Sequence, residues 1–402
     1  MAAGLLAGTR VIELGQNLAG PFAGEILADL GATVIKVEKP EGGDDARRWG
    51  PPITADAAAG FHAMNRNKLS VVLDLASEEG RAKLDALLGD SDVLVHNLRP
   101  GVMRKLGFGA EEVMARHPRL IYCDMGAFGH VGPLRDRPGY EPLMQAFSGL
   151  ISANGHPDGP PARLGASVVD LGTGMWTAIG ALAALLRRGQ TGRGCVVNTS
   201  LFETALLWCG FHLVTYMTGG GLPVRHGTGH PQIVPYQAFE TGNGPLVIAA
   251  GNDRLFARLA AALGHPEWAA DPLFLTNEDR SRNRGVLLPM IAGIVAGTTK
   301  EELSERLEAA GVPCAPIHTV DEVLAHPQTE ALGILQRSPQ LDLSLIGMPV
   351  SFDGERPAYR RDAPALGADT DAVLVAGRQD PVSRISAARA PARPRGTGSA
   401  PR

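Results

Sequence analysis

The chain has few of the residues that serve metal, redox or disulfide chemistry. Only four of its 402 residues are cysteine, and their spacing fits no metal site. They stand among apolar neighbours, which predicts small buried residues in a reducing compartment: Cys123, Cys195, Cys209 and Cys314. The eleven histidines are scattered, and His226 and His230 have no partners at metal-ligand spacing. No metal site is therefore expected.

Long apolar runs and strong charge are also scarce. No apolar run approaches the roughly 20 residues of a membrane span, and the apolar stretch at residues 1–6 is too short for a signal peptide. The formal net charge of −4 gives no sign of a general nucleic-acid or membrane-surface protein. We therefore expect a soluble cytoplasmic protein with neither nucleic acid nor membrane as partner, long enough for two or more domains.

Several common catalytic motifs are missing. No G-x-S-x-G occurs, which argues against a serine hydrolase with a nucleophile elbow. The turn at residues 15–20 lacks G-x-G-x-x-G, so a bound dinucleotide does not follow from it. No cysteine lies in an obviously electropositive niche, as a nucleophilic thiolate would require. Carboxylate chemistry remains.

What the chain does contain is a repeated strand–turn–helix pattern. This pattern predicts an α/β fold with a Rossmann-like, doubly wound large domain. We expect strands at residues 10–14, 33–38, 69–75, 93–96 and 120–124, with helices at 21–30 and 77–88.

The rhythm changes after a glycine-rich break at residues 219–221. We expect the large domain to cover residues 1–220 and a smaller α+β domain to cover 225–330. Short strands then return the chain to the large domain over 333–375. Residues 377–402 are rich in Arg, Ala, Pro and Ser with almost no large apolar residue, which predicts a disordered tail.

Basic residues gather after the strands of the predicted sheet. Lys39 follows the second strand, and Arg99, Arg104 and Lys105 follow the strand at 93–96. Open α/β sheets bind ligands beyond the carboxyl ends of their strands. Several cations converging there suit a ligand that carries phosphate groups.

Asp170 ends an apolar run and is followed by small residues and a long apolar helix pattern over 176–186. We expect it after a strand, at the positive end of that helix, where backbone N–H groups favour an ionised carboxylate. An ordinary N-cap role is the plainer alternative. Gly172 and Gly174 would let a substrate approach closely. Glu141 is a second carboxylate, at the start of another helix, and carboxylates can act as covalent nucleophiles toward activated acyl groups.

Several separate motifs, in this order, carry a family resemblance. They are Leu18-Ala19-Gly20-Pro21, Ala28-Asp29-Leu30-Gly31-Ala32, Val34-Ile35-Lys36-Val37-Glu38, Asn65-Arg66-Asn67-Lys68, Asn97-Leu98-Arg99-Pro100-Gly101, Pro138-Gly139-Tyr140-Glu141, Asp170 with Gly172-Thr173-Gly174-Met175, and Gly192-Arg193-Gly194. The chain, over about 8–370, resembles the family III CoA-transferases, which include formyl-CoA transferase and carnitine CoA-transferase.

The resemblance implies that Asp170 is the nucleophile, with Tyr140 and Glu141 beside it. It implies an aspartyl mixed anhydride and an aspartyl-CoA thioester, a coenzyme A thioester as substrate, a small carboxylic acid as its partner, and no permanently bound cofactor or metal. The implied coenzyme A contacts are Lys39, Leu73, Asn97, Leu98, Arg99, Arg104 and Lys105. Two-domain subunits threaded into an interlocked homodimer are implied as well.

The chain departs from formyl-CoA transferases in two places, which argues against oxalate as the acceptor. Leu18 stands where those enzymes carry Gln, and residues 249–253 replace a run of glycines. The segment 233–239 looks more like transferases that use succinyl-CoA and other dicarboxylic acids. The second carboxylate of such an acid would require a cation, for which Arg225 and Arg254 are candidates.

Two other readings stay open. The α-methylacyl-CoA racemases share the fold but place a His where this chain has Tyr140, and a tyrosine titrating near 10 is a poor base at neutral pH. A non-enzymatic coenzyme A-binding protein would keep the basic cluster but would not need Asp170.

Overall fold

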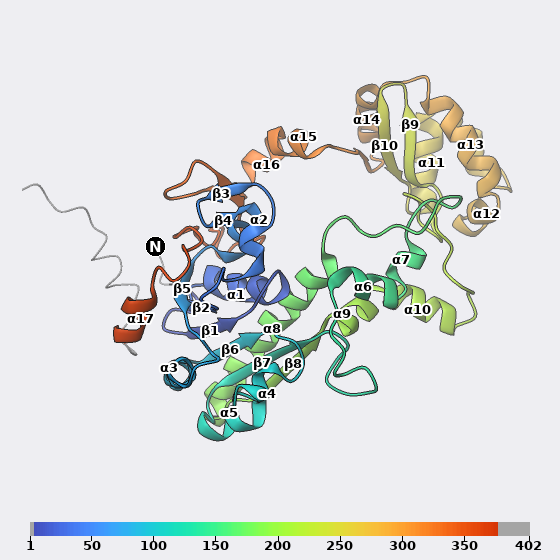
Figure 1. The fold of residues 1–402 in the computed structure, drawn as a ribbon. Coiled ribbons are helices and arrows are strands. Elements are labelled where there is room, and N and C mark those ends of the chain that lie inside the picture. The colour runs from blue at the N-terminus through green and yellow to red at the C-terminus, as the bar shows by residue number, and fades with distance from the viewer. Residues whose placement is uncertain (1–3, 377–402) are drawn as a thin grey trace, which may run out of the picture. The chain divides into compact units, whose positions relative to one another are not determined.

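The structure, a computed structural model, describes residues 4–376 (Figure 1). The tail expected over 377–402 lies outside the described residues. The chain divides into two compact units, the first comprising residues 4–148, 166–208 and 333–376 and the second 149–165 and 209–332. Two segments expected in the large domain, 149–165 and 209–220, thus belong to the second unit.

A parallel sheet of six strands forms the middle of the first unit, in the order β5-β2-β1-β6-β7-β8. Its strands are β1 (Arg10–Leu14), β2 (Thr33–Glu38), β5 (Lys68–Val72), β6 (Val93–His96), β7 (Ile121–Gly126) and β8 (Val196–Ser200). This confirms the α/β class and the doubly wound large domain. The expected strands match closely, and the sheet gains β8.

Helices cover both faces of this sheet (Figure 1). On one face α1 (Ala19–Asp29) and α8 (Val168–Thr191) pack against each other and against the strands. On the other face a core joins alternate strand residues such as Ile12 and Ile35 to α3 (Glu78–Gly89) and α5 (Ala110–Arg116). Because successive strand residues point to opposite faces, Glu13 and Lys36 point toward α1 and α8 instead.

The remaining elements of the first unit are short. They are η1 (Asp45–Arg48), β3 (Pro52–Thr54), β4 (Ala57–Ala58), α2 (Ala59–Asn65), α4 (Val102–Lys105), α6 (Glu141–Phe147), α9 (Leu201–Trp208), β12 (Leu335–Arg337), β13 (Ser344–Ile346) and α17 (Thr370–Ala376).

The α8 helix begins earlier than the sequence pattern indicates. Ser167 is its N-cap residue, so Asp170 lies inside the first turn, and the expectation of a strand before Asp170 is wrong. The helix ends at Thr191, where Gly192 adopts a left-handed conformation with φ of 70°. This helix is long and apolar enough to span a membrane by length and composition, with 44% of its most apolar window buried in the protein. Core helices of soluble proteins meet the same criterion.

The last described segment completes the open edge of the sheet at β5. The Ser70 amide donates to Asp369 Oδ2 at 3.0 Å, and the Val72 amide donates to Thr370 Oγ1 at 3.0 Å. The amide oxygen of Asn67, whose φ is +61°, accepts from two more backbone amides of this segment. The contacts of Ser70 and Val72 satisfy edge amides that would otherwise be exposed, and those of Asn67 hold the segment against the edge.

The second unit is a small α+β fold, as expected, around an antiparallel sheet ordered β11-β10-β9. Buried apolar residues of the sheet and its helices form a separate core. The strands are β9 (Tyr236–Thr241), β10 (Gly244–Ala249) and β11 (Cys314–Pro316); the helices are α7 (Leu150–Ala153), α10 (Gly210–Met217), α11 (Asp253–Ala262), η2 (Pro266–Ala270), α12 (Asn277–Arg282), α13 (Arg284–Val295), α14 (Lys300–Ala309), α15 (Val320–Ala325) and α16 (Pro327–Ala331).

Candidate active site

The strand order brings most candidate ligand residues to one edge of the large sheet. Leu73 follows β5, Lys39 follows β2, Gln16 lies just after β1, and Asn97 and Arg99 follow β6. These four strands are neighbours in the parallel sheet, so their carboxyl ends meet along one edge. The chain runs outward from β1 through β2 to β5 and then crosses to β6 on the other side of β1. The β1–β6 boundary is therefore the switch point where open α/β sheets bind ligands.

Asn97 ties the two strand ends at this switch point together. Its side-chain oxygen accepts from the Gln16 amide at 2.8 Å, and its side-chain NH2 donates to the Gln16 carbonyl at 2.8 Å. A Cβ on Gly20 would lie 2.7 Å from the Gly15 Cα and 3.0 Å from the Asn97 side chain. The turn between β1 and α1 can therefore close only with small residues at both ends.

A buried lysine holds the same turn from below. Lys36 Nζ lies 2.8 Å from Glu13 Oε1, 2.9 Å from Asp44 Oδ2 and 2.7 Å from the Gly15 carbonyl oxygen. Burial opposes its charge, but the carboxylates of Glu13 and Asp44 outweigh burial and raise the pKa of Lys36. Asp44 also accepts from the backbone amide of Asn17, at 3.0 Å. Lys36, which the sequence shows only as a polar residue in an apolar strand, therefore fixes the loop beyond β1.

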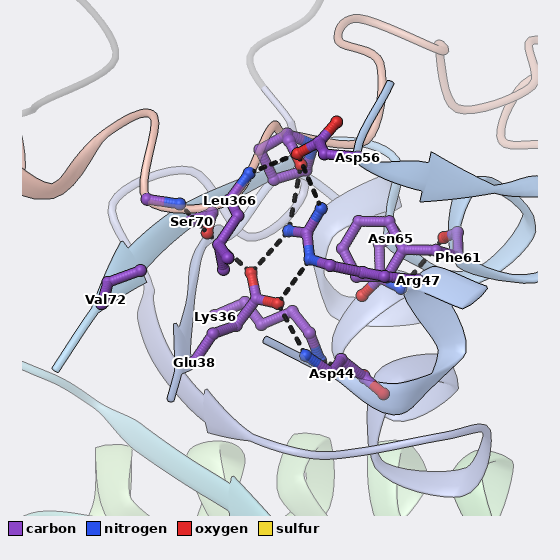
Figure 2. Close-up of polar contacts among 12 residues, drawn as sticks. Lys36, Glu38, Asp44, Arg47, Asp56, Phe61, Asn65, Ser70, Val72 and Leu366 are labelled. Carbon is purple, nitrogen blue, oxygen red and sulfur yellow. Dashed lines mark hydrogen bonds and ion pairs between the residues drawn. The ribbon is translucent and has the colours of Figure 1, made fainter. Parts of the chain in front are cut away.

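A second buried ion pair stands beside the first (Figure 2). Arg47 forms two hydrogen bonds to Glu38, at 2.7 and 2.8 Å, and its guanidinium lies 3.8 Å from the centre of the Phe61 ring. Ser70 donates to Glu38 at 2.6 Å, and the Asp44 amide donates to it at 3.0 Å. Burial works against ionised Glu38, but these donors and the cation prevail and hold its pKa below the usual range. The loop after β2 is thereby tied to β2 and β5.

Two glycines of α8 set the position of Asp170. A Cβ on Gly174 would lie 2.7 Å from the Ala19 carbonyl oxygen, so α8 touches the first turn of α1 there. A Cβ on Gly172 would lie 2.7 Å from the Trp208 ring. Both glycines lie inside α8 and serve helix packing, so the expectation that they let a substrate approach closely is wrong. Asp170 lies one turn before Gly174, so α8 carries it toward the β1–α1 turn.

Asp170 is a partly buried carboxylate with a second carboxylate acting on it. Burial, followed by the negative field of Glu141, raises the pKa of Asp170 from 3.8 to about 7. Glu141 is the first residue of α6, as expected, and is itself buried, with Oε1 accepting from the side-chain NH2 of Gln145 at 2.5 Å. Tyr140 precedes it and is 59% exposed. The structure therefore brings Glu141 into electrostatic reach of Asp170 and leaves Tyr140 open to solvent.

Apart from Asn97, described above, the expected coenzyme A residues fall into a cationic group and an apolar group. The cationic side chains are exposed: Lys39 pairs with Asp45 at 3.0 Å, while Arg99 and Lys105 have no ion-pair partner within residues 4–376. Arg104 lies with Lys105 in the last turn of α4 and is likewise exposed. The apolar side chains are not exposed in this way: Leu73 is buried in the sheet core, and Leu98 packs at the margin of that core. Leu73 can therefore offer a ligand its backbone but not its side chain.

Sequence reasoning missed a histidine–aspartate cluster formed by the last residue of β6, Asp124 within β7, and the loop after β7. Asp124 lies 3.6 Å from His96 Nε2 and 3.7 Å from His130 Nδ1. His96 Nε2 also lies 3.1 Å from the Tyr122 hydroxyl, which donates to the Phe108 carbonyl at 2.8 Å. Burial lowers the pKa of His96 and keeps it neutral. His96 and Asp124 end two predicted strands, so the same strand-end rule that selected Lys39 and Arg99 could have found them.

Within residues 4–376, no group of three or more His, Cys, Asp or Glu side chains is arranged to hold a metal ion.

Comparison with known proteins identifies the class to which this fold and site belong. The profile of CoA-transferase family III matches residues 6–370, so the chain belongs to that family. The protein is accordingly a CoA-transferase, an enzyme class whose members act on CoA thioesters and carboxylic acids.

Relatives of known activity cover nearly the whole chain. The succinate–glutarate CoA-transferase of Agrobacterium fabrum is 36% identical over 92% of this chain and 94% of its own length. The human succinyl-CoA:glutarate CoA-transferase is 34% identical over 92% of this chain and 85% of its own length. The acetyl-CoA:oxalate CoA-transferase of Acetobacter aceti is 39% identical over 89% and 92%. Among solved structures, a CAIB/BAIF family protein from Brucella suis is 36% identical, with a TM-score of 0.82 over 92% of this chain and 98% of its own.

One of these relatives bears on the acceptor. The Acetobacter aceti enzyme is named for oxalate, although the sequence of this chain departs from formyl-CoA transferases at Leu18 and over 249–253. Those departures therefore do not by themselves decide against oxalate.

Proposed function

We propose that this protein transfers CoA from a dicarboxylyl-CoA, with succinyl-CoA as the first candidate, to a carboxylic acid, using Asp170 as the covalent nucleophile. The observation that carries the proposal is the placement of Asp170. It is a partly buried carboxylate in the first turn of a long helix, α8, which packs against the first turn of α1 next to the switch point of the sheet. A carboxylate with little water around it is a stronger nucleophile toward a thioester than a fully hydrated one.

The reaction would run through balanced exchanges at the Asp170 carboxyl. A carboxylate oxygen attacks the thioester carbonyl, the C–S bond breaks, and CoA leaves as the thiolate with an aspartyl–acyl anhydride behind it. The thiolate then attacks the aspartyl carbonyl and releases the donor acid. The acceptor carboxylate displaces the thiolate from this aspartyl-CoA thioester, and the thiolate finally attacks the new acyl group. The thioester bond energy is kept throughout, so no ATP is required.

The basic residues beyond the strands would hold the coenzyme. Lys39, Arg99, Arg104 and Lys105 offer exposed cations at the edge where Asn97 orders the strand ends. Phosphate groups favour such cations through charge-assisted hydrogen bonds. The backbones of Leu73 and Leu98 complete the proposed surface. Glu141 would keep Asp170 poised between its two protonation states, and Tyr140 would face the bound acyl group.

Names of relatives guide the choice of acids. Two of the relatives described above are named for succinate or succinyl-CoA with glutarate, and one is named for acetyl-CoA with oxalate. A dicarboxylic acid is the feature common to all three. We therefore propose a dicarboxylic acid as donor or acceptor and leave its length to the assay.

A homodimer in the cytoplasm fits this function. Large apolar side chains of α6, α8 and α9 are exposed in the single chain, among them Leu143, Phe147, Ile179 and Leu207. Exposed apolar surface of this kind marks an interface. The interlocked dimer implied by the family would cover it.

The test is a transfer assay with two arms. Succinyl-CoA and a panel of carboxylic acids should yield a new acyl-CoA by mass, with one free succinate per transfer and no net hydrolysis. A 2-methylacyl-CoA in deuterated water should gain no deuterium at the α-carbon. The Asp170→Ala variant should lose transfer and keep its fold and CoA binding.

Two results would reverse the proposal. Full transfer activity in Asp170→Ala would show that Asp170 is not the nucleophile. Deuterium uptake without acyl transfer would point to racemase chemistry, which requires an acid and a base on opposite faces of the α-carbon.

A further inference from the structure

A small cavity in the second unit lies apart from every residue assigned so far. Its volume is about 180 Å³, large enough for a few water molecules or one small organic acid. Its walls come from α10, from the glycine-rich segment 220–224 and from the loop before β9. The polar side chains among the lining residues are His212, Thr215, His226 and Gln232.

The walls of this cavity carry hydrogen-bond donors and no acid. None of the described residues that line it is Asp or Glu. Arg284, the first residue of α13, touches two of the lining residues: Nη2 donates to the Pro231 carbonyl at 2.7 Å, and Nη1 lies 3.2 Å from His226 Nδ1. Arg284 is not itself a lining residue, and its Nε and Nη2 also donate to Ser281, at 3.3 and 3.2 Å. Its positive charge is therefore fixed behind the wall, next to His226 and Pro231.

The contacts of Arg284 also decide which nitrogen of His226 carries the proton. A guanidinium can only donate, so His226 Nδ1 must accept, and the neutral ring keeps its hydrogen on Nε2. Burial, together with Arg284, lowers the pKa of His226 and holds it neutral at pH 7. His226 thus offers an N–H donor without adding charge.

His230 behaves in the same way beside the cavity. Its Nδ1 accepts from the backbone amides of Gln232 and Ile233, each at 3.1 Å, so its proton also lies on Nε2. Its ring lies 6.3 Å from that of Phe211, a lining residue. Burial and the positive field of Arg284 lower the pKa of His230 as well.

We propose that this cavity is a binding site for a small carboxylate anion. One guanidinium balances one negative charge, and neutral imidazole, hydroxyl and amide donors can satisfy the lone pairs of a carboxylate. A phosphate dianion places two negative charges on one group, which would demand more cations than Arg284 alone supplies, whereas each carboxylate of a dicarboxylic acid carries one. The choice of a carboxylic acid as the ligand rests on the proposed function, since carboxylic acids are the substrates of a CoA-transferase.

The cation that a dicarboxylic acid requires is therefore assigned to Arg284. The alternatives nominated from the sequence are less suited. Arg225 donates to the carbonyls of His156, Pro157 and Gly159, none of which lines the cavity. Arg254 is exposed on α11 and, unlike Arg284, hydrogen-bonds no lining residue within residues 4–376.

The experiment measures binding apart from catalysis. Glutarate is titrated into the full-length Asp170→Ala variant carrying histidine labelled with 13C at Cε1, and the His212 and His226 signals are assigned with the His212→Gln and His226→Gln variants. We expect both signals to shift and saturate with glutarate and to stay fixed with dimethyl glutarate, which has no charge. Arg284→Ala removes the positive charge behind His226 and should weaken binding roughly 10-fold.

A second variant guards against local damage by Arg284→Ala. Gln232→Glu adds a negative charge to the wall and removes no side-chain contact within residues 4–376, so its fold should remain intact. It should abolish the glutarate shifts, while Arg254→Ala should bind glutarate like the parent. Equal glutarate binding by the parent and Gln232→Glu would overturn the site, as would equal shifts with dimethyl glutarate or with inorganic phosphate.

Transfer kinetics, measured in proteins that keep Asp170, show whether the bound anion is the acceptor acid or a separate effector. If Gln232→Glu lowers kcat/KM for a dicarboxylic acceptor more than for a monocarboxylic one, the anion is the acceptor acid. If kcat/KM is unchanged while binding is lost, the anion is a separate effector. Both results support the site. Absence of transfer by the parent would contradict the proposed function and leave the binding result standing.

Discussion

Replacing Asp170 with Asn should stabilise the fold at alkaline pH. The carboxyl has a pKa near 7 in the folded protein against 3.8 for an ordinary aspartate, chiefly because it is buried. Between these two values the folded protein holds a proton that the unfolded chain has released. The free energy of unfolding therefore falls as pH rises through this window, and the full penalty is present above pH 7.

The size of the effect follows from the shift. At about 1.4 kcal/mol per pH unit, a rise from 3.8 to about 7 corresponds to an upper limit of about 4 kcal/mol. Asp170 is partly exposed, and solvent screening reduces that figure, so we expect roughly 1–3 kcal/mol. The Asn variant has no carboxylate to ionise and should escape the penalty.

Urea unfolding at pH 4 and pH 8 is the assay. The free energy of unfolding of Asp170→Asn should exceed that of the parent by roughly 1–3 kcal/mol at pH 8, and the two values should approach each other at pH 4. Asp136→Asn, on an exposed loop, is the matched control and should show no such pH-dependent gain. If the variant is no more stable than the parent at pH 8, the claim that ionised Asp170 destabilises the folded protein is refuted.

Three further changes test the surroundings of the site. Lys36→Met should destabilise the first unit by roughly 3–5 kcal/mol, because it leaves buried Asp44 without its cation and Glu13 with Lys68 alone. Gly174→Val should cost roughly 1–3 kcal/mol and reduce transfer, because its Cβ would lie 2.7 Å from the Ala19 carbonyl oxygen. Arg99→Ala and Lys105→Ala should each weaken CoA binding, with a larger effect at low salt, since exposed charge–phosphate contacts are screened by ions.

The controls for these variants are simple. Gly189→Ala, in the same helix as Gly174, has nothing within 4 Å of its Cβ and should be tolerated. CoA binding that is unchanged in both basic variants would move the proposed phosphate contacts elsewhere. A Lys36→Met protein as stable as the parent would mean that the ion cluster does not hold the β1–α1 turn.

The strand ends could be predicted from the sequence because local patterns define them. Apolar runs bounded by turns gave Lys39, Asn97 and Arg99 their positions after strands, and the structure keeps them there. The order of the strands could not be predicted, since it depends on which edges pair over long distances. Only that order places β2, β1 and β6 side by side and makes the three residues neighbours along one edge.

Asp170 shows why local patterns also mislead. Val168 and Val169 are β-branched, and Gly172 and Gly174 are poor helix formers, so the sequence predicts a strand before Asp170 and a helix only over 176–186. The structure makes the whole stretch helical because α1 and Trp208 approach too closely for any larger side chain. Tertiary packing overrides the local preference at this point.

Partners that are far apart in the sequence were equally out of reach. Lys36 is recognisable as polar in an apolar strand, but its partner Asp44 lies in a loop without a pattern. Arg284 is separated from His226 by 58 positions, and no periodicity connects them. Such pairs require the fold itself.

Trapping the covalent intermediate tests the central claim most directly. The protein is incubated with succinyl-CoA, quenched with hydroxylamine or borohydride during turnover, and mapped by peptide mass spectrometry beside the Asp170→Asn variant. We predict modification of the peptide that contains Asp170, at that residue alone, and none in the variant. Modification at Glu141 instead, or transfer that proceeds with Asp170 unmodified throughout, would contradict the account.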